Sequence, residues 1–325
     1  MFFLLMLFLS TMITLSANNW LGMWMGLEIN LMSFIPLISK NMNKSSSQSM
    51  MIYFLTQSIG SVTLLFSILM KPMLFINEFM NQELFKIMMM ISMMIKVGIA
   101  PFHLWFPEMM SNLAWLEASL LLTWQKVAPL FIMNYMTPNL WLIYFAAILS
   151  SMVGSIGGLN QTSLRKILAY SSINHLGWMI MFMSMNIMWY KYLILYSVMI
   201  FMLCLILSVN NFYFMNQVNS PSFSMMEKFS LSIMLLSMGG MPPFIGFLPK
   251  WMVIQNMIKS NLYLVMIIMM LMSLITLFYY LRLSSAMILM YSTMNKWNYS
   301  KINKTYFFMI YLFNLSLPLF SIINF

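Results

Sequence analysis

The sequence predicts an all-α integral membrane protein, a polytopic bundle of about eleven transmembrane helices. Hydrophobic residues make up 62% of the 325 residues and charged residues only 7%, whereas soluble domains carry about 25%. The mean hydropathy is +0.86. Apolar runs of about 20 residues, the length that spans a bilayer, recur along the whole chain. We therefore expect a single integral membrane domain over residues 1–325, with lipid as its main solvent.

The apolar runs are separated by short polar connections. They lie near 2–17, 20–38, 50–70, 86–106, 113–133, 139–158, 167–186, 190–214, 229–258, 261–281 and 305–323. Gly and Pro interrupt the fourth and ninth runs, so we expect broken helices there. The first run has no basic segment before it, and we expect no cleaved targeting peptide.

Basic residues in the connections predict the orientation. The net charge of +10 comes from 16 Lys and Arg against 6 acids, all of them Glu. With the N-terminus inside, inner connections hold Lys40, Lys44, Arg165, Lys166, Lys228, Arg282, Lys296, Lys301 and Lys304. Outer connections then hold Lys71, Lys86, Lys191 and Lys259. Because inner loops of membrane proteins are enriched in Lys and Arg, this count favours N-inside and C-outside, and nucleic-acid binding is not expected.

The two interrupted runs share a motif. GIAPFHLWFP (98–107) and GMPPFIGFLP (240–249) both fit G-x-x-P-F-x-x-x-x-P, 142 residues apart. Backbone groups freed inside a membrane are tolerated where protein or a watery cavity satisfies them. A matched pair of broken helices is typical of transporters built from repeats, although Gly and Pro are also common in spanning helices by chance. The two G-x-x-x-G pairs, at 22–26 and 154–158, are interpreted as helix-packing sites.

Three lysines lie inside or beside these runs. Lys96 is about ten residues from either end of its run, or about 15 Å. Lys126 is about 10 Å from the nearer end and is followed by Pro129. Lys250 follows the second break, as Lys96 precedes the first. An ionisable residue at a helix centre costs about 2.5–3.5 kcal/mol on insertion scales, which favours a transport role. A buried ion pair, snorkelling to the interface or anchoring of a short helix are the respective alternatives.

Other ionisable groups are candidate partners. Glu28 is the acid that lies well inside a run without a lysine, and we expect it to pair with Lys96. His175 could either hydrogen-bond within the bundle or relay protons, and His103 is open to the same two interpretations. Glu108 and Glu117 lie near run ends, where an interfacial carboxylate is the simpler interpretation.

Buried Lys, Glu and His side chains can together move protons. A lysine in water has a pKa of about 10.4, so it must be made to release its proton. Burial and nearby like charge favour the neutral form, whereas a paired carboxylate favours the charged form. No cofactor or metal is expected in this chain, because Cys204 is the sole cysteine and neither G-x-G-x-x-G nor a P-loop is present. The two separated histidines make a poor metal site.

Four segments resemble a known family. They are KVGIAPFHLWFPE (96–108), LLTWQKVAP (121–129), GGLNQTSLRKILAYSSINHLGW (157–178) and GGMPPFIGFLPKW (239–251). They are similar to the chain 2 family of mitochondrial NADH–ubiquinone oxidoreductases, antiporter-like subunits of the membrane arm of respiratory complex I. The resemblance covers nearly the whole chain. The length and the 45 methionines resemble insect members.

The resemblance implies a proton-translocating role. The complex transfers electrons from NADH to ubiquinone and pumps protons out of the matrix. Matched motif by motif, the relay of the family becomes Glu28, Lys96, Lys126 and Lys250, with His175 as a further candidate. NADH, FMN, iron–sulfur clusters and ubiquinone would belong to other subunits. The implied partners are neighbouring antiporter-like chains, accessory subunits and lipids of the mitochondrial inner membrane.

The loop-charge count, applied to the mitochondrial inner membrane that the resemblance implies, predicts a topology. The N-terminus and residues 39–48 and 282–304 would face the matrix, and the C-terminus the intermembrane space.

Two other functions stay open. A self-sufficient cation/proton antiporter would move ions without the complex, but the lack of Asp argues against a dedicated Na⁺ site. A structural spacer would tolerate neutral replacements of the buried lysines.

Overall fold

The computed structural model describes residues 2–40, 44–70, 78–136, 140–185, 188–218, 225–289 and 304–318. In these ranges fifteen helices follow one another, and the β-type pairing described is one isolated bridge between Ser163 and Phe214. The predicted all-α class is confirmed. Contacts divide the chain into two compact units, Met1–Leu149 and Ser150–Phe325.

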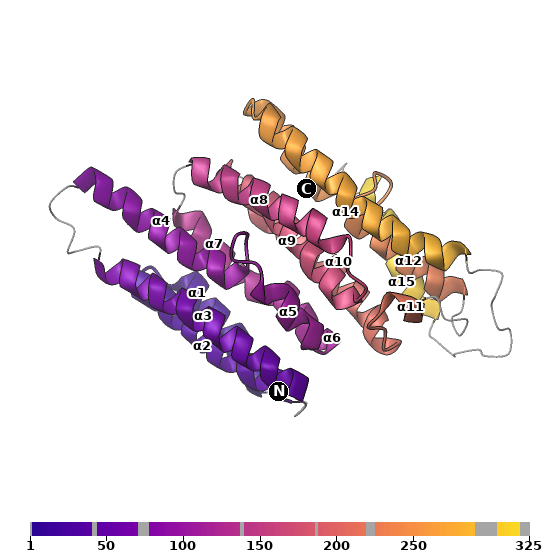
Figure 1. Ribbon diagram of the computed structural model, residues 1–325, viewed down its shortest axis with the longest axis horizontal. Coiled ribbons are helices and arrows are strands. Elements are labelled where there is room, and N and C mark those ends of the chain that lie inside the picture. The colour runs from indigo at the N-terminus through magenta and orange to yellow at the C-terminus, as the bar shows by residue number, and fades with distance from the viewer. Residues whose placement is uncertain are drawn as a thin grey trace. The chain divides into compact units, whose positions relative to one another are not determined.

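The first unit contains seven helices and the start of an eighth. They are α1 (Phe2–Ser16), α2 (Trp20–Ile38), α3 (Lys44–Met70), α4 (Glu78–Val97), α5 (Trp105–Asn112), α6 (Trp115–Leu122), α7 (Trp124–Met136) and α8 (Leu140–Gly158). Helices α1, α2 and α3 lie side by side, and α4 packs between α3 and α7 (Figure 1). Helix α7 also contacts α2, so residues of α2, α3, α4 and α7 meet inside this unit.

The second unit contains the remaining helices. They are α9 (Leu164–Ser184), α10 (Trp189–Val209), α11 (Met215–Val218), α12 (Met225–Gly239), α13 (Phe247–Lys259), α14 (Tyr263–Leu289) and α15 (Lys304–Leu315). Helix α12 packs on α10, α14 and α15, and α13 contacts α9, α10 and α14. In α9, 17 of 21 residues are buried. The polar residues of α9 therefore face protein rather than lipid.

Each expected apolar run corresponds to one helix or to two consecutive helices. Among the described residues, five helices are long and apolar enough to cross a membrane by length and composition. They are α2, α3, α8, α10 and the part of α14 over Tyr263–Ser285. Three other runs are divided into shorter helices, and α1 and α15 have 15 and 12 residues. The count of eleven spans stays a prediction.

Several helices include basic residues that we expected to lie in connections. Lys228 lies in the first turns of α12, where its side chain is 6% exposed, and Arg282 lies within α14. The interpretation as loop residues is wrong for these two residues and also for Lys86, within α4, and for Arg165, Lys166 and Lys191, in the first turns of α9 and α10. Lys44, Lys259 and Lys304 are terminal residues of helices. Lys71, Lys296 and Lys301 lie outside the described residues. Helix α12 begins four residues before the expected run, and α14 continues beyond Arg282 because the sequence stays free of Gly and Pro up to Leu289.

The predicted breaks at 97–101 and 240–244 are confirmed. Gly98 and Gly240 adopt φ angles of +79° and +83°, a left-handed conformation that favours glycine. The N–H groups of residues 98 and 99 both donate to the Met94 carbonyl, and those of residues 240 and 241 both donate to the Leu236 carbonyl. The hydrogen bonds at the two breaks thus match each other at the same spacing of 142 residues that separates the two sequence motifs. The peptide bond between Ala100 and Pro101 is cis.

A third division, between α6 and α7, was not predicted. It falls at Thr123, whose hydroxyl donates to the Ser119 carbonyl at 2.7 Å. Side-chain bonds of this kind often bend helices. Pro129 follows in the next turns and cannot donate to the Gln125 carbonyl. Lys126 therefore lies in the first turn after a helix break, as a consequence of Thr and Pro rather than Gly.

Candidate functional site

Lys96 and Lys126 line one small cavity inside the first unit. Lys96 lies in the last turn of α4 and Lys126 near the start of α7, and their side chains are 6% and 2% exposed. The cavity measures about 20 Å³, which is room for about one water molecule. Its lining consists of Leu27, Asn30, Leu31, Tyr53, Gln57, Lys96, Val97, Trp105, Phe106, Leu121, Gln125, Lys126 and Pro129. Two of the four predicted relay residues thus share one polar site.

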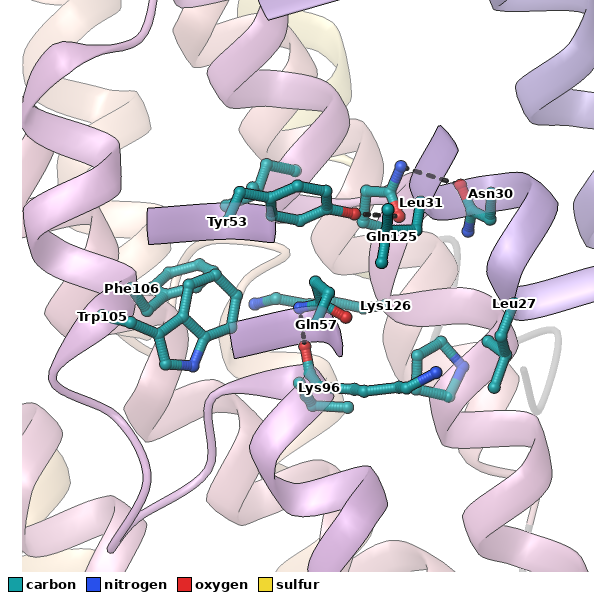
Figure 2. A pocket seen from close by; sticks show the side chains of 13 residues that line it. Leu27, Asn30, Leu31, Tyr53, Gln57, Lys96, Trp105, Phe106, Gln125 and Lys126 are labelled. Carbon is teal, nitrogen blue, oxygen red and sulfur yellow. Dashed lines mark hydrogen bonds between the residues drawn. The ribbon is translucent and has the colours of Figure 1, made fainter. Parts of the chain in front are cut away.

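Uncharged polar side chains surround the two lysines. Gln57 Nε2 donates to the Lys96 carbonyl at 2.9 Å, which satisfies a backbone group at the end of α4 (Figure 2). Gln125 Nε2 donates to Asn30 Oδ1 at 2.9 Å, and the Tyr53 hydroxyl lies 3.4 Å from Gln125 Oε1. We did not predict this chain of side chains from α2, α3 and α7. The available signal was the presence of Asn and Gln within apolar runs.

The two ammonium groups point in different directions. Figure 2 shows Lys126 reaching toward Phe106, and its Nζ lies 5.4 Å from the ring centroid, a cation–π contact. Lys96 extends instead toward Leu27, the neighbour of Glu28 in α2. This arrangement separates two like charges within one enclosed site.

Glu28 acts on Lys96 without touching it. Its side chain is half-buried in α2, and the two groups interact electrostatically. The described contacts include no direct ion pair between them. Lys96 instead packs across Gly60 of α3, where a Cβ atom would lie 2.7 Å from Lys96 Cγ. The pairing of Glu28 with Lys96 therefore stays a prediction.

Lys250 lies at the second break, in the second unit. It is 4% exposed in the first turn of α13, and its Nζ donates to the Gly239 carbonyl at 2.7 Å. A Cβ atom at Gly240 would lie 2.7 Å from Lys250 Nζ, so the ammonium occupies room that only glycine leaves. The lysine thus satisfies the last carbonyl of α12 with its own charged group.

His175 is buried in α9 and is hydrogen-bonded. It is 2% exposed, and its Nδ1 lies 2.8 Å from the Tyr192 hydroxyl of α10. His103 is half-buried beside the first break, with Nδ1 3.1 Å from the Pro101 carbonyl oxygen. Glu108 is exposed in the first turn of α5, and Glu117 accepts a hydrogen bond from the Ala114 N–H at 3.3 Å.

In the described part of the chain, no three or more His, Cys, Asp and Glu side chains are grouped in a way that could hold a metal ion. Cys204 is buried as a free thiol. The chemistry that this site offers is the gain and loss of protons by buried lysines.

Comparisons with known proteins point to one family. The family described as NADH:quinone oxidoreductase/Mrp antiporter, TM, matches residues 17–276. The chain is 45% identical to NADH-ubiquinone oxidoreductase chain 2 of Anopheles gambiae over 302 residues, which cover 91% of this chain and 87% of that protein. It is 42% identical to the same chain of Locusta migratoria, with 93% and 89% covered.

A solved structure shows a similar fold. A chain of respiratory complex I from Thermus thermophilus superposes with a TM-score of 0.83 at 18% identity, and 98% of this chain and 77% of that chain are covered. The two insect relatives are similar over nearly their whole length. This chain therefore belongs to the NADH-ubiquinone oxidoreductase chain 2 family.

Proposed function

We propose that this chain moves protons across the membrane as a core membrane-arm subunit of respiratory complex I, through Glu28, Lys96, Lys126 and Lys250. The observation that carries the proposal is the burial of three lysines, each at most 6% exposed and each beside a helix break. Such residues persist in membranes where they have a function. His175 is a further candidate for the relay.

The cavity suggests how a proton could pass from Lys96 to Lys126. Two ammonium groups around one enclosed cavity repel each other, so a proton that arrives at one lysine favours release from the other. One water molecule in the cavity could carry the proton between them. Glu28 stabilises the charged form of Lys96, and a movement of α2 relative to α4 would change that stabilisation. This gives a switch that couples proton uptake to a shift of helices.

In this proposal, other subunits carry out the electron transfer. The oxidation of NADH and the reduction of ubiquinone drive the pump, and the groups that perform them, FMN and iron–sulfur clusters among them, are held by other subunits. The chain lies in the mitochondrial inner membrane as a multi-pass protein, in contact with other membrane-arm subunits. Neighbouring antiporter-like chains and accessory subunits are the proposed partners.

Substitution of Lys96 tests the relay. Lys96→Met removes the titrating group while nearly preserving side-chain length and helix propensity. Lys96→Arg keeps the charge but cannot release a proton at accessible pH. We expect both changes to lower proton pumping and NADH:ubiquinone turnover by roughly tenfold or more, equivalent to a barrier increase of at least ~1.4 kcal/mol. Turnover and pumping are measured in vesicles and normalised to assembled complex.

The exposed Lys259, at the end of α13, provides the matched control. Lys259→Met should pump normally. Full activity of the Lys96→Met complex would rule out the relay and leave the structural spacer. Full activity of Lys96→Arg alone would reduce Lys96 and Glu28 to a structural charge pair. Cation/proton exchange by the isolated chain in vesicles would favour the stand-alone antiporter.

The proposed orientation has its own test. The N-terminus should face the matrix and the C-terminus the intermembrane space, as the distribution of Lys and Arg favours. Single cysteines introduced at exposed Lys40 and exposed Tyr263 are labelled with a membrane-impermeant reagent in intact mitochondria and in mitoplasts. Lys40→Cys should react only after the inner membrane is opened. Labelling of this cysteine from the intermembrane side would reverse the topology.

A further inference from the structure

A cluster of buried polar rings occupies the second unit. It consists of His175 on α9, Tyr192 and Tyr196 on α10, and Tyr279 and Tyr280 on α14. All five side chains are at most 2% exposed. Burial of a polar group is costly unless the group finds polar partners, so four enclosed tyrosines beside one histidine are expected to interact with one another and with neighbouring polar groups.

The rings are connected step by step. His175 Nδ1 lies 2.8 Å from the Tyr192 hydroxyl, and the His175 and Tyr196 ring centroids are 4.9 Å apart. Tyr196 and Tyr280 lie close enough for ionisation of one to affect the other, and the ring centroids of Tyr279 and Tyr280 are 4.8 Å apart. The bond with Tyr192 holds the imidazole ring in one orientation.

Two serines of α9 face the same hydroxyl groups. Ser172 interacts with Tyr196, and Ser171 interacts with both Tyr279 and Tyr280. Ser171, Ser172 and His175 share one face of α9, since residues three and four apart are neighbours on a helix. The hydroxyls of Tyr279 and Tyr280 form no direct hydrogen bond within 3.5 Å among the described atoms. They therefore keep capacity both to donate and to accept.

The cluster reaches the helix break that holds Lys250. Tyr280 packs against Gly239, where a Cβ atom would lie 3.6 Å from Tyr280 Cδ2. The carbonyl of this same Gly239 accepts the hydrogen bond from Lys250 Nζ at 2.7 Å. Helix α13, which carries Lys250, contacts all three helices of the cluster. The ring of Tyr280 thus packs on the residue whose carbonyl binds Lys250.

We propose that Tyr196 and Tyr280 are relay residues that carry protons between His175 and Lys250. The proposal rests on the proposed function, because it requires Lys250 to gain and lose a proton. Each hydroxyl, directly or through a serine or water, accepts a proton on its oxygen as it passes its own proton on, and the tyrosine is neutral before and after. The net transfer is one proton from the imidazolium of His175 to the neutral amine of Lys250. That amine can keep its hydrogen bond to Gly239 while its lone pair accepts the proton.

Removal of single hydroxyl groups tests the proposal. Tyr196→Phe and Tyr280→Phe keep the ring and its packing and remove one oxygen each. Tyr190→Phe is the matched control, because Tyr190 lies on α10 but is 46% exposed. Complex I with each change is reconstituted in vesicles, and protons pumped per electron are measured across pH together with turnover per assembled complex. We expect a loss of about five- to tenfold in pumping and a displaced pH profile for both variants, and no change for the control.

The outcomes separate this inference from the proposed function. Normal pumping by Tyr196→Phe, Tyr280→Phe and their double variant, with Lys250→Met inactive, would overturn the tyrosine relay and keep the lysine relay. A loss of turnover with unchanged protons per electron and an unchanged pH profile would make the tyrosines structural and also overturn the inference. Normal pumping by Lys250→Met and Lys96→Met would overturn the proposed function itself. If one tyrosine variant does not assemble, the other decides.

Discussion

The two broken helices end with the same left-handed glycine and matching hydrogen bonds but satisfy their free carbonyl groups differently. At the first break, neutral donors bind the last carbonyls of α4: Gln57 binds that of Lys96, and the Trp105 indole N–H binds that of Ile95 at 3.2 Å. At the second break, Lys250 itself binds the last carbonyl of α12. The ammonium of Lys96 is therefore left to the cavity, whereas the ammonium of Lys250 takes part in the break.

Because of this difference, a change of protonation has different consequences at the two lysines. A proton added to or removed from Lys96 changes the charge in a cavity that it shares with Lys126. A proton added to or removed from Lys250 changes the strength of a hydrogen bond that stabilises a helix end, since bonds from charged donors are roughly twice as strong. We infer that titration of Lys250 is more tightly coupled to backbone geometry than titration of Lys96.

The largest effect expected from this comparison follows substitution of the two left-handed glycines. An L-residue in this conformation costs about 1–2 kcal/mol, and both Gly98→Ala and Gly240→Ala carry that strain. Only at Gly240 would the new Cβ also displace a lysine ammonium, from 2.7 Å. At Gly98 the nearest atoms belong to Phe106 and Trp105, at 3.3 Å. Gly240→Ala should abolish pumping in assembled complex. The loss of pumping in Gly98→Ala should be several-fold smaller.

Pumping per assembled complex measures the lysine displacement, and the yield of assembled complex measures the strain that both variants share. Equal losses of pumping in the two variants would mean that the backbone conformation alone matters. Such a result would contradict the inference that Lys250 is more tightly coupled to backbone geometry than Lys96. It would not affect the match between the two breaks.

The main features of the fold were predictable from hydropathy, and the two helix breaks were predictable from their Gly and Pro residues. Gly98 and Gly240 can be recognised from the sequence as helix breaks, because glycine followed closely by proline in an apolar run has few structural uses other than to interrupt a helix. The division at Thr123 has no such sign. Threonine is ordinary in membrane helices, and its bond to the Ser119 carbonyl depends on a rotamer that no sequence pattern specifies.

The candidate site was predictable only in its charged members. Lys96, Lys126 and Lys250 stand out because charges are costly in lipid. Gln57, Gln125 and Tyr53 cost less to bury, so their positions carry little signal until α3, α4 and α7 are packed together. The joint cavity of Lys96 and Lys126 is a tertiary property, because the two residues are 30 positions apart and meet only when α7 packs on α4.

An intermediate effect is expected from Gln57→Leu. This change removes the neutral donor to the Lys96 carbonyl and leaves a buried acceptor unsatisfied, at a cost of about 1–3 kcal/mol. The end of α4 should open locally, and Lys96 could then bind its neighbouring carbonyls in the way that Lys250 does. Faster hydrogen exchange over residues 94–99, with reduced pumping, is the expected result. Unchanged exchange in this segment would show that Gln57 does not hold the break, and the contrast between neutral and charged donors would lose its functional meaning.

The smallest effect is expected from Gly60→Ala, which tests lysine packing without backbone strain. A Cβ atom at Gly60 would lie 2.7 Å from Lys96 Cγ, as close as the one at Gly240 lies to Lys250 Nζ. Gly60 is inside regular helix α3, where alanine is favoured over glycine by about 1 kcal/mol. The contact is also with the flexible stem of Lys96 rather than with its ammonium, so the side chain can move by a few tenths of an ångström. Assembly should therefore stay normal and pumping should fall by about twofold at most, well within the cost of a small core overpacking.

Gly22→Ala provides the matched control, since Gly22 lies in helix α2 and its nearest neighbour is the Cβ of Ala17 at 3.1 Å. This control should pump normally. A loss in Gly60→Ala as large as that in Gly240→Ala would mean that Lys96 is held as rigidly as Lys250. The cavity would then require a fixed lysine position, and the proposed transfer to Lys126 would depend on movement of water rather than on movement of the Lys96 side chain.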